Sequence, residues 1–240
     1  MNSKLLIWDM DGTLIYDCES GRVAMEKAFE IAFGVKDAFK TIEMSGRTDT
    51  IIFYDACDSL GINHNEYDKF IDTYYNVLNQ DLEKLNTIKI IPNVSSVLDS
   101  LKGNGVLNIL GTGAAERIAR TKLSYVGLNK YFKTGGFGDN IVDRSELIKK
   151  AIENAEKLYN TSFNKEYIFI IGDTPGDIEA ARALGIKIIS MATGSYLVKD
   201  LMKYKPDFVF DNFEDIDHFL KVVGISLLFS WALSWTLTWV

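Results

Sequence analysis

Two aspartates at the end of an apolar segment are the residues of this chain best suited to chemistry. Asp9 and Asp11 follow the apolar segment Lys4–Trp8 and precede Gly12 and Thr13, within the sequence LLIWDMDGTL. In a loop that leaves a strand, both carboxylates can face one pocket, while Gly12 permits a turn whose backbone N–H groups approach an anion. At average residue frequencies, such a four-position match arises by chance in roughly less than one chain per hundred of this length. The pattern therefore favours a reactive site over an acidic surface turn.

A second pair of aspartates follows another apolar segment. Asp173 and Asp177 flank a Thr-Pro-Gly turn in the sequence YIFIIGDTPGDIEAARALG. Taken alone, this pair has a structural interpretation, since Asp177 suits a helix cap and Asp173 a turn. Combined with the first pair, it brings several carboxylates to one edge of a sheet, where their mutual repulsion requires a cation. Hard oxygen ligands of this kind suit Mg²⁺.

A hydroxyl group and a guanidinium group complete the candidate site. Thr112 and Gly113 follow the apolar segment Val106–Leu110 and are suited to bind a phosphate oxygen through the hydroxyl and the next backbone N–H. Arg144 precedes an amphipathic segment and could supply a fixed positive charge. Each feature is weak by itself, because a threonine after a strand usually belongs to a turn and an arginine at a helix start is usually solvated.

Five short apolar segments alternate with amphipathic stretches, and this alternation predicts a parallel sheet with crossover helices. The segments are Lys4–Trp8, Val106–Leu110, Tyr167–Ile171, Lys187–Met191 and Asp207–Phe210. Helical periodicity follows Pro92 and Ser145, and a third helical stretch ends at Gly185. We therefore predict an α/β fold with a Rossmann-like parallel sheet as its core.

The alternation stops between Tyr16 and Leu85, where no strand-like segment separates the helical stretches. Those stretches are Arg22–Phe33, Thr48–Leu60 and Asn65–Leu85. They predict an all-helical insertion over the carboxyl end of the first strand, where open α/β sheets bind ligands. The predicted domains are a core of residues 1–15 and 87–221, a helical cap of residues 16–86 and a hydrophobic C-terminal tail of residues 222–240.

In their order along the chain, these motifs resemble those of the haloacid dehalogenase superfamily. The likeness lies in strand-DxDGT, strand-Thr, a basic residue before a helix and strand-GDxxxD, and it covers roughly residues 4–215. The insertion resembles the helical cap, type C1, of that superfamily, and Gly46–Asp49 resembles the specificity loop of its phosphoglycolate phosphatase-like members. The basic residue is commonly Lys there, whereas we assign it to Arg144, because Lys149 and Lys150 fit the spacing less well.

This resemblance implies a Mg²⁺-dependent phosphatase that acts on a small phosphorylated metabolite. It implies that Asp9 is a nucleophile that forms an aspartyl-phosphate, while Asp11 protonates the leaving oxygen and then activates water. It also implies that the Asp9 carboxylate, the Asp11 backbone carbonyl and Asp173 bind Mg²⁺, with Asp177 as a further ligand or an indirect partner. Covalent catalysis with charge neutralisation suits the high barrier to phosphomonoester hydrolysis.

The same resemblance assigns residues to the substrate. Thr112 would bind the phosphate, with Gly113 beside it, and Arg47 would reach a carboxylate or hydroxyl of the substrate when the cap closes. For Arg47 the alternative is a solvated side chain next to a helix cap formed by Thr48. If Arg47 acts on the substrate, Arg47→Ala should raise KM or lower kcat.

Asp11 also separates the chemistries of the superfamily. Its dehalogenases lack an aspartate at this position and need no Mg²⁺, so dehalogenation is disfavoured here. Its phosphonate hydrolases use a cap lysine, whereas this chain offers Arg47, so carbon–phosphorus cleavage is disfavoured too. Two alternatives stay open, namely a β-phosphoglucomutase-like mutase with the same core motifs and a binding protein that keeps the fold without turnover.

The net charge and the cysteines limit which partners and which cellular location we expect. With 26 basic and 33 acidic residues, the formal charge of −7 argues against an extended nucleic-acid surface. Cys18 and Cys57 form no CxxC or metal-ligand spacing, and the first residues do not make a secretory signal, so we expect reduced thiols and a cytoplasmic protein. The oligomeric state cannot be predicted from these features.

The C-terminal segment 222–240 carries no charge over 19 residues, close to the roughly 20 that a transmembrane helix requires. However, Trp231, Trp235 and Trp239 recur along its length and are not gathered at its ends, and no charge follows it. Membrane contact is therefore not favoured over a packed helix, a strand or a segment unrelated to catalysis.

Overall fold

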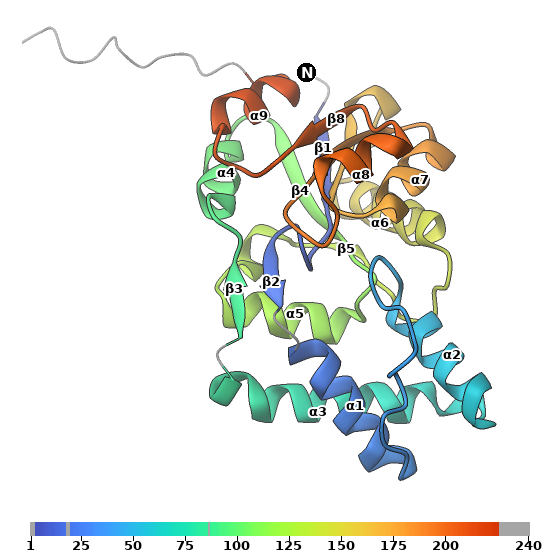
Figure 1. Ribbon diagram of the computed structural model, residues 1–240. Helices are drawn as coiled ribbons and strands as arrows, with labels where there is room; N and C mark the ends of the chain where they lie inside the picture. The colour runs from blue at the N-terminus through green and yellow to red at the C-terminus, as the bar shows by residue number, and fades with distance from the viewer. Residues whose placement is uncertain (1–2, 18–19, 86, 226–240) are drawn as a thin grey trace, which may run out of the picture.

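The computed structural model describes residues 3–17, 20–85 and 87–225. Its centre is a sheet of six parallel strands. The strand order is β5-β4-β1-β6-β7-β8 (Figure 1). The strands are β1 (Lys4–Trp8), β4 (Val106–Gly111), β5 (Gly135–Gly136), β6 (Ile168–Gly172), β7 (Lys187–Met191) and β8 (Phe208–Phe210). This sheet confirms the predicted Rossmann-like α/β fold, and β5 is its one strand outside the predicted segments.

Strand β1 lies in the middle of the sheet, where it pairs with β4 on one side and β6 on the other. Asp9, Thr112 and Asp173 directly follow β1, β4 and β6. Because these three strands are parallel and adjacent, their carboxyl ends meet at one edge of the sheet. The topology thus brings the three sequence motifs together.

Both faces of the sheet are covered by helices, which explains why most residues of its strands are apolar. One core contains Leu6 and Trp8 of β1 and residues of α4 (Val94–Leu101), α5 (Glu116–Tyr125) and α9 (Ile216–Val222). The other contains Leu5 and Ile7, which point the opposite way, and residues of α6 (Arg144–Tyr159) and α7 (Pro175–Leu184). The remaining short helices are α8 (Val198–Leu201), η2 (Asn129–Tyr131), η3 (Lys165–Tyr167) and η4 (Met202–Tyr204).

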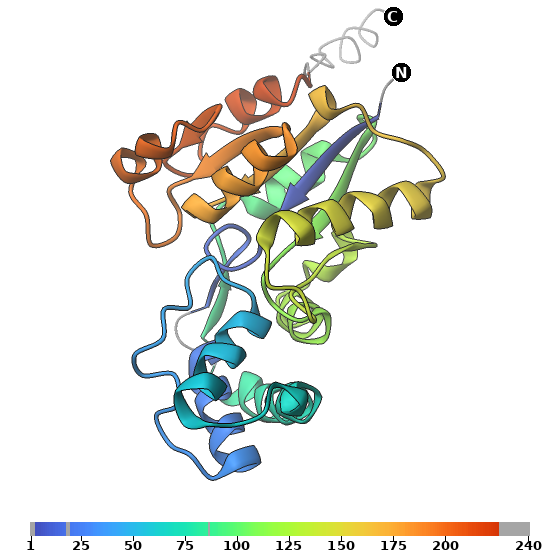
Figure 2. The same cartoon turned by 90° about the vertical axis from the view of Figure 1, so that its right-hand side faces the viewer.

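A helical unit, residues 20–85, lies beyond the carboxyl edge of the sheet (Figures 1 and 2). It contains α1 (Ser20–Phe33), α2 (Asp49–Leu60), η1 (His64–Glu66) and α3 (Tyr67–Leu85). Its interior is aromatic, with the rings of Phe53 and Phe70 stacked at 4.9 Å between centroids. The antiparallel strands β2 (Ile15–Asp17) and β3 (Ile88–Ile90) join the unit to the sheet.

The described part of the chain ends with α9 and the turn that follows it. The predicted tail of residues 222–240 therefore falls mostly on residues 226–240, which lie outside the described residues. Among the residues that are described, no helix is both long and apolar enough to cross a membrane.

Candidate active site

A cavity of about 430 Å³ separates the carboxyl edge of the sheet from the helical unit. The sheet side contributes Asp9, Asp11, Thr112, Gly113, Lys122, Arg144 and Asp173, and the other side contributes Arg22, Met25, Arg47, Asp49, Ile52 and Tyr74. Every sequence-predicted site residue except Asp177 lines this cavity. Asp177 is fully buried next to it.

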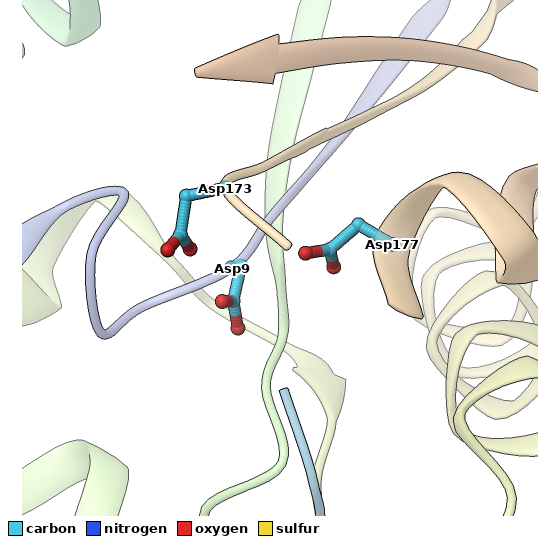
Figure 3. Close-up of side chains that lie close together, drawn as sticks. All are labelled: Asp9, Asp173 and Asp177. Atoms are coloured by element: carbon cyan, nitrogen blue, oxygen red, sulfur yellow. The ribbon is translucent and has the colours of Figure 1, made fainter. Parts of the chain in front are cut away.

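Three buried aspartates meet at the sheet end of the cavity, and we call Asp9, Asp173 and Asp177 the acidic cluster (Figure 3). They come from the ends of β1 and β6 and from the first turn of α7, and one carboxylate oxygen of each lies within 4.8 Å of the others. The Arg144 guanidinium lies beside them, with Nη2 3.0 Å from Asp9 Oδ1 and 2.6 Å from Asp177 Oδ1. The assigned basic residue therefore contacts two of the three carboxylates.

Asp177 also serves the local structure. Its Oδ2 accepts hydrogen bonds from the backbone N–H and the hydroxyl of Thr174, at 3.1 and 2.7 Å, which ties the start of α7 to the loop after β6. Its Oδ1 is bound by Arg144. Since both oxygens already have partners, this geometry favours an indirect role for Asp177 over direct metal binding.

The acidic cluster holds more negative charge than Arg144 compensates. Burial raises the pKa of Asp9 to about 7, although the Arg144 charge lowers it. Burial, together with the charge of Asp9, raises the pKa of Asp173 well above its usual range. Asp173 accepts a hydrogen bond from Thr13 Oγ1 at 3.2 Å. A divalent cation would favour the ionised carboxylates, and hard oxygen donors suit Mg²⁺, so these residues fit the predicted metal.

The loop after β4 lies against the helical unit. Thr112 is buried, and its hydroxyl accepts a hydrogen bond from the Ala114 N–H at 3.3 Å. Gly113 O accepts a hydrogen bond from the Asp49 N–H at 2.8 Å, and a Cβ at Gly113 would collide with the backbone carbonyl of Arg47. A glycine is therefore needed where this loop and the helical unit approach each other.

Asp49, to which the sequence analysis gave no role of its own, adds a second contact between this loop and the helical unit. Its buried carboxylate accepts a hydrogen bond from the Ala115 N–H at 2.9 Å, next to the start of α5. Burial raises the pKa of Asp49 to about 6 in spite of that hydrogen bond. Thr48 forms the N-cap of α2 by accepting a hydrogen bond from the Ile51 N–H at 3.3 Å, as one of the two interpretations of this segment expects.

Lys122 is a second residue that the sequence analysis missed, and with Asp11 and Asp17 it forms what we call the linker cluster. Its Nζ lies 2.7 Å from Asp17 Oδ2 and 3.2 Å from both oxygens of Asp11. Burial alone would lower the pKa of Lys122, but the charges of Asp11 and Asp17 outweigh it and raise the pKa well above its usual value. The two carboxylates therefore favour the charged form of Lys122 in the cavity wall.

A sequence signal for Lys122 does exist. On α5, the buried residues Ile118, Ala119 and Leu123 form one face, and Lys122 falls on that same face. A lysine inside an apolar helix stripe needs a carboxylate partner. This signal depends on recognising residues 116–125 as a helix, and that helix was not among those predicted from the sequence.

The guanidinium of Arg47 has its polar partners within the helical unit itself. Its Nη2 lies 2.7 Å from Asp55 Oδ2, and its Nη1 donates to Glu43 O at 3.0 Å. Arg47 is one of the residues that line the cavity. Arg22, also in the wall, donates to Phe39 O at 3.0 Å.

Comparison with protein-family models gives a match to the haloacid dehalogenase-like hydrolase model over residues 6–191, which is more than half of the chain. This chain belongs to the haloacid dehalogenase-like hydrolase family. The match includes both aspartate pairs and Arg144, and it confirms the superfamily suggested by the motifs.

Relatives of this haloacid dehalogenase-like hydrolase include proteins named phosphoglycolate phosphatase. The one from Salmonella typhimurium is 24% identical over 148 residues, which are 62% of this chain and 56% of that protein. The alignment thus spans little more than half the length of that relative. The one from Aquifex aeolicus is 23% identical over 216 residues, 89% of this chain and 94% of that protein.

Solved structures share the fold of this hydrolase. A crystal structure described as a predicted phosphoglycolate phosphatase from Haemophilus somnus 129PT superposes with a TM-score of 0.68 at 19% identity. The superposition covers 92% of this chain and 98% of that one. At this identity, the likeness concerns the fold alone.

Proposed function

We propose that this haloacid dehalogenase-like hydrolase is a Mg²⁺-dependent phosphatase that hydrolyses a small organic phosphomonoester through an aspartyl-phosphate on Asp9. The observation that carries the proposal is the acidic cluster, in which three buried carboxylates lie together at the carboxyl edge of the sheet and the Arg144 guanidinium contacts two of them. Such a cluster suits a divalent cation and a bound phosphate better than it suits a stable empty site. Family membership and the names of the relatives agree with this chemistry.

Mg²⁺ would be held by the carboxylates of Asp9 and Asp173 and by the backbone carbonyl of Asp11. When bound, it neutralises the carboxylates and the negative charge of the phosphoryl group. Asp177 supports this site indirectly, because its oxygens bind Arg144 and Thr174.

Each half-reaction is assigned to residues of the chain. In the first, an oxygen of Asp9 attacks phosphorus, the ester P–O bond breaks, and Asp11 gives its proton to the leaving alcohol oxygen. In the second, Asp11 takes a proton from a water molecule that attacks phosphorus, so Asp9 and inorganic phosphate are released. Thr112 binds a phosphate oxygen, and Arg144 orients the Asp9 carboxylate and offsets its charge.

Residues 16–86 act, in this proposal, as a cap that closes over the cavity. Hydrogen bonds from the Asp49 N–H to Gly113 O and from the Thr50 hydroxyl to Gly138 O, at 2.8 and 2.5 Å, support a closed arrangement that excludes water. Arg47 contributes to substrate binding after exchanging its Asp55 partner for the substrate. Arg47→Ala should then raise KM a few-fold, about 1 kcal/mol of binding, in steady-state kinetics.

Phosphoglycolate is the first compound to test, because relatives carry the name phosphoglycolate phosphatase. We propose a cytoplasmic location on the cysteine pattern alone, with Cys57 free and buried.

The test is phosphate release from a panel of small phosphomonoesters, with Mg²⁺ and with chelator, for wild type and Asp9→Asn. Asp207→Asn is a matched control, since Asp207 lies outside the cavity and accepts a hydrogen bond from the Ile188 N–H. The proposal expects Mg²⁺-dependent release by wild type and the control, and a loss of at least about 10⁴-fold in Asp9→Asn. Transfer of the phosphoryl group to a sugar hydroxyl would instead support the mutase. No turnover of any compound by the folded protein would support the binding protein.

A further inference from the structure

Lys122 lies at the junction of three parts of the molecule. It belongs to α5, which packs on the sheet, while Asp11 belongs to the loop after β1 and Asp17 ends the linker strand β2. Asp17 also binds the first turn of α1, because its carboxylate accepts hydrogen bonds from the backbone N–H groups of Ser20 and Gly21 at 2.9 and 3.0 Å. The Lys122 ammonium thus connects Asp11, the proposed general acid and base, to the first turn of the cap.

The two carboxylates of the linker cluster hold Lys122 unequally. The side chains of Lys122 and Asp17 are only 5% and 7% exposed, and their contact is the short one, at 2.7 Å. The Asp11 side chain is 45% exposed, faces the cavity, and receives two equal contacts of 3.2 Å. The buried pair therefore fixes the position of the ammonium, and the ammonium in turn restrains the exposed carboxylate.

Close packing limits other positions for the ammonium. A Cβ at Gly21 would lie 2.9 Å from Asp17 Oδ2 and 3.0 Å from Lys122 Nζ, so α1 closes directly over this ion pair. A buried ammonium that lost one of its carboxylates would be costly. Displacement of Asp17 by movement of the cap would therefore displace Lys122, and with it the contact to Asp11.

We propose that Lys122 is a positioning residue for the proton transfers of Asp11 and that Asp17 makes this positioning depend on the cap. The proposal rests on the proposed phosphatase function. With the helical unit in this position, Lys122 holds the Asp11 carboxylate at the cavity surface, where the proposed leaving oxygen would lie. Lys122 itself transfers no proton and acts only through the Asp11 carboxylate.

The consequence is a dependence on the leaving group. An alkyl phosphate releases a poor alkoxide leaving group and needs the proton from Asp11, whereas p-nitrophenyl phosphate releases a stable phenolate and does not. The constant kcat/KM reports the steps up to release of the alcohol, so it isolates this first proton transfer from the later hydrolysis of the phosphoenzyme. A residue that only stabilises the fold would affect both substrates alike.

The experiment compares kcat/KM for an alkyl phosphate and for p-nitrophenyl phosphate in wild type, Lys122→Met and Lys122→Arg. We expect Lys122→Met to lose about 10²-fold with the alkyl phosphate but less than about 10-fold with p-nitrophenyl phosphate. Lys122→Arg keeps a cation and should recover part of the loss. Asp17→Asn can still cap α1 through its amide oxygen, so this variant should fold. It should lower the ratio of kcat/KM for the alkyl phosphate to kcat/KM for p-nitrophenyl phosphate, but less than Lys122→Met does.

Arg117→Met is the matched control, because Arg117 also lies on α5 and joins it to the helical unit, through Asp72 of α3 at 2.5 Å. It should leave the ratio of the two substrates as in wild type. Equal losses on both substrates in Lys122→Met, or an altered ratio in Arg117→Met, would overturn the role of Lys122 while leaving the phosphatase intact. Absence of Mg²⁺-dependent phosphatase activity in wild type would instead remove the proposed function, and this inference with it.

Discussion

The acidic cluster and the linker cluster occupy the same cavity but are built differently. The acidic cluster is buried and comes entirely from loops and a helix next to the sheet, and two of its three carboxylates contact the Arg144 guanidinium. The linker cluster joins the sheet side to the helical unit, and its Asp11 side chain stays 45% exposed. One cluster is thus a fixed site, whereas the other can respond to the position of the helical unit.

Charge balance sharpens this difference. With all groups ionised, the three carboxylates of the acidic cluster and Arg144 leave two negative charges in excess, while the linker cluster leaves one. The exposed member of the linker cluster can be solvated, but the acidic cluster is shielded from water. A bound cation is therefore expected at the acidic cluster and is not needed at the linker cluster.

The largest effect in this comparison is expected from Arg144→Ala. Removing the guanidinium leaves the acidic cluster without a positively charged side chain and misplaces the Asp9 carboxylate. Phosphatase kcat/KM should fall by about 10³-fold or more. Lys149→Ala and Lys150→Ala change exposed residues of the same helix and should retain wild-type activity. An active Arg144→Ala together with an inactive lysine variant would reverse the assignment of the basic residue.

A smaller effect, on metal binding and stability, is expected from Asp173→Asn. Burial and the charge of Asp9 raise the pKa of Asp173, so the ionised carboxylate destabilises the metal-free fold at neutral pH. With chelator present, the variant should therefore unfold at a temperature about 3 °C above that of wild type. With Mg²⁺, the order should reverse, because the variant binds the ion at least about 10-fold more weakly. A lower unfolding temperature in chelator, or unchanged Mg²⁺ affinity in calorimetry, would show that charge crowding does not define this cluster.

An effect on the pH dependence of stability alone is expected from Asp49, which touches neither cluster directly. Its folded pKa of about 6 exceeds the value of 3.8 for an exposed carboxyl, so the folded protein binds a proton more readily than the unfolded chain. Asp49 therefore costs stability above pH 6, and this cost disappears as the pH falls toward 4. Besides burial, the charged groups that act on it are Lys122, Asp11 and Asp139.

Asp49→Asn keeps an acceptor for the Ala115 N–H and removes the charge. It should raise the free energy of unfolding at pH 8 by up to about 3 kcal/mol, and the gain should vanish near pH 4. Denaturant unfolding at a series of pH values measures this difference. A gain that stays constant with pH would mean that the Asp49 carboxylate does not titrate as assigned.

The sequence was informative where a motif directly follows a strand. Asp9, Thr112 and Asp173 could be placed together because neighbouring parallel strands end at the same edge of a sheet. This prediction needs only the positions of the strands in the sequence and the rule that crossover connections between parallel strands are right-handed. The strand β5 was missed because two glycines give no apolar pattern, and β2 and β3 because three residues are too short for one.

Contacts between distant segments could not be predicted in the same way. Lys122 and Asp11 are 111 positions apart in the sequence, and nothing near Asp11 indicates which lysine approaches it. Asp49 likewise reads as an ordinary residue of the first helical turn until its carboxylate is placed against the Ala115 N–H. These pairings depend on how the helical unit sits on the sheet.

The central claim, that Asp9 is phosphorylated, is tested most directly by trapping the intermediate. The Asp11→Asn variant should slow its hydrolysis, so a ³²P-labelled substrate with a good leaving group, mixed with Mg²⁺ and quenched in acid, should leave label on the protein. The account predicts close to one hydroxylamine-labile phosphoryl group per chain, on the peptide that contains Asp9, and none in the Asp9→Asn variant. Phosphate release without label on that peptide, or label on another residue, would contradict it.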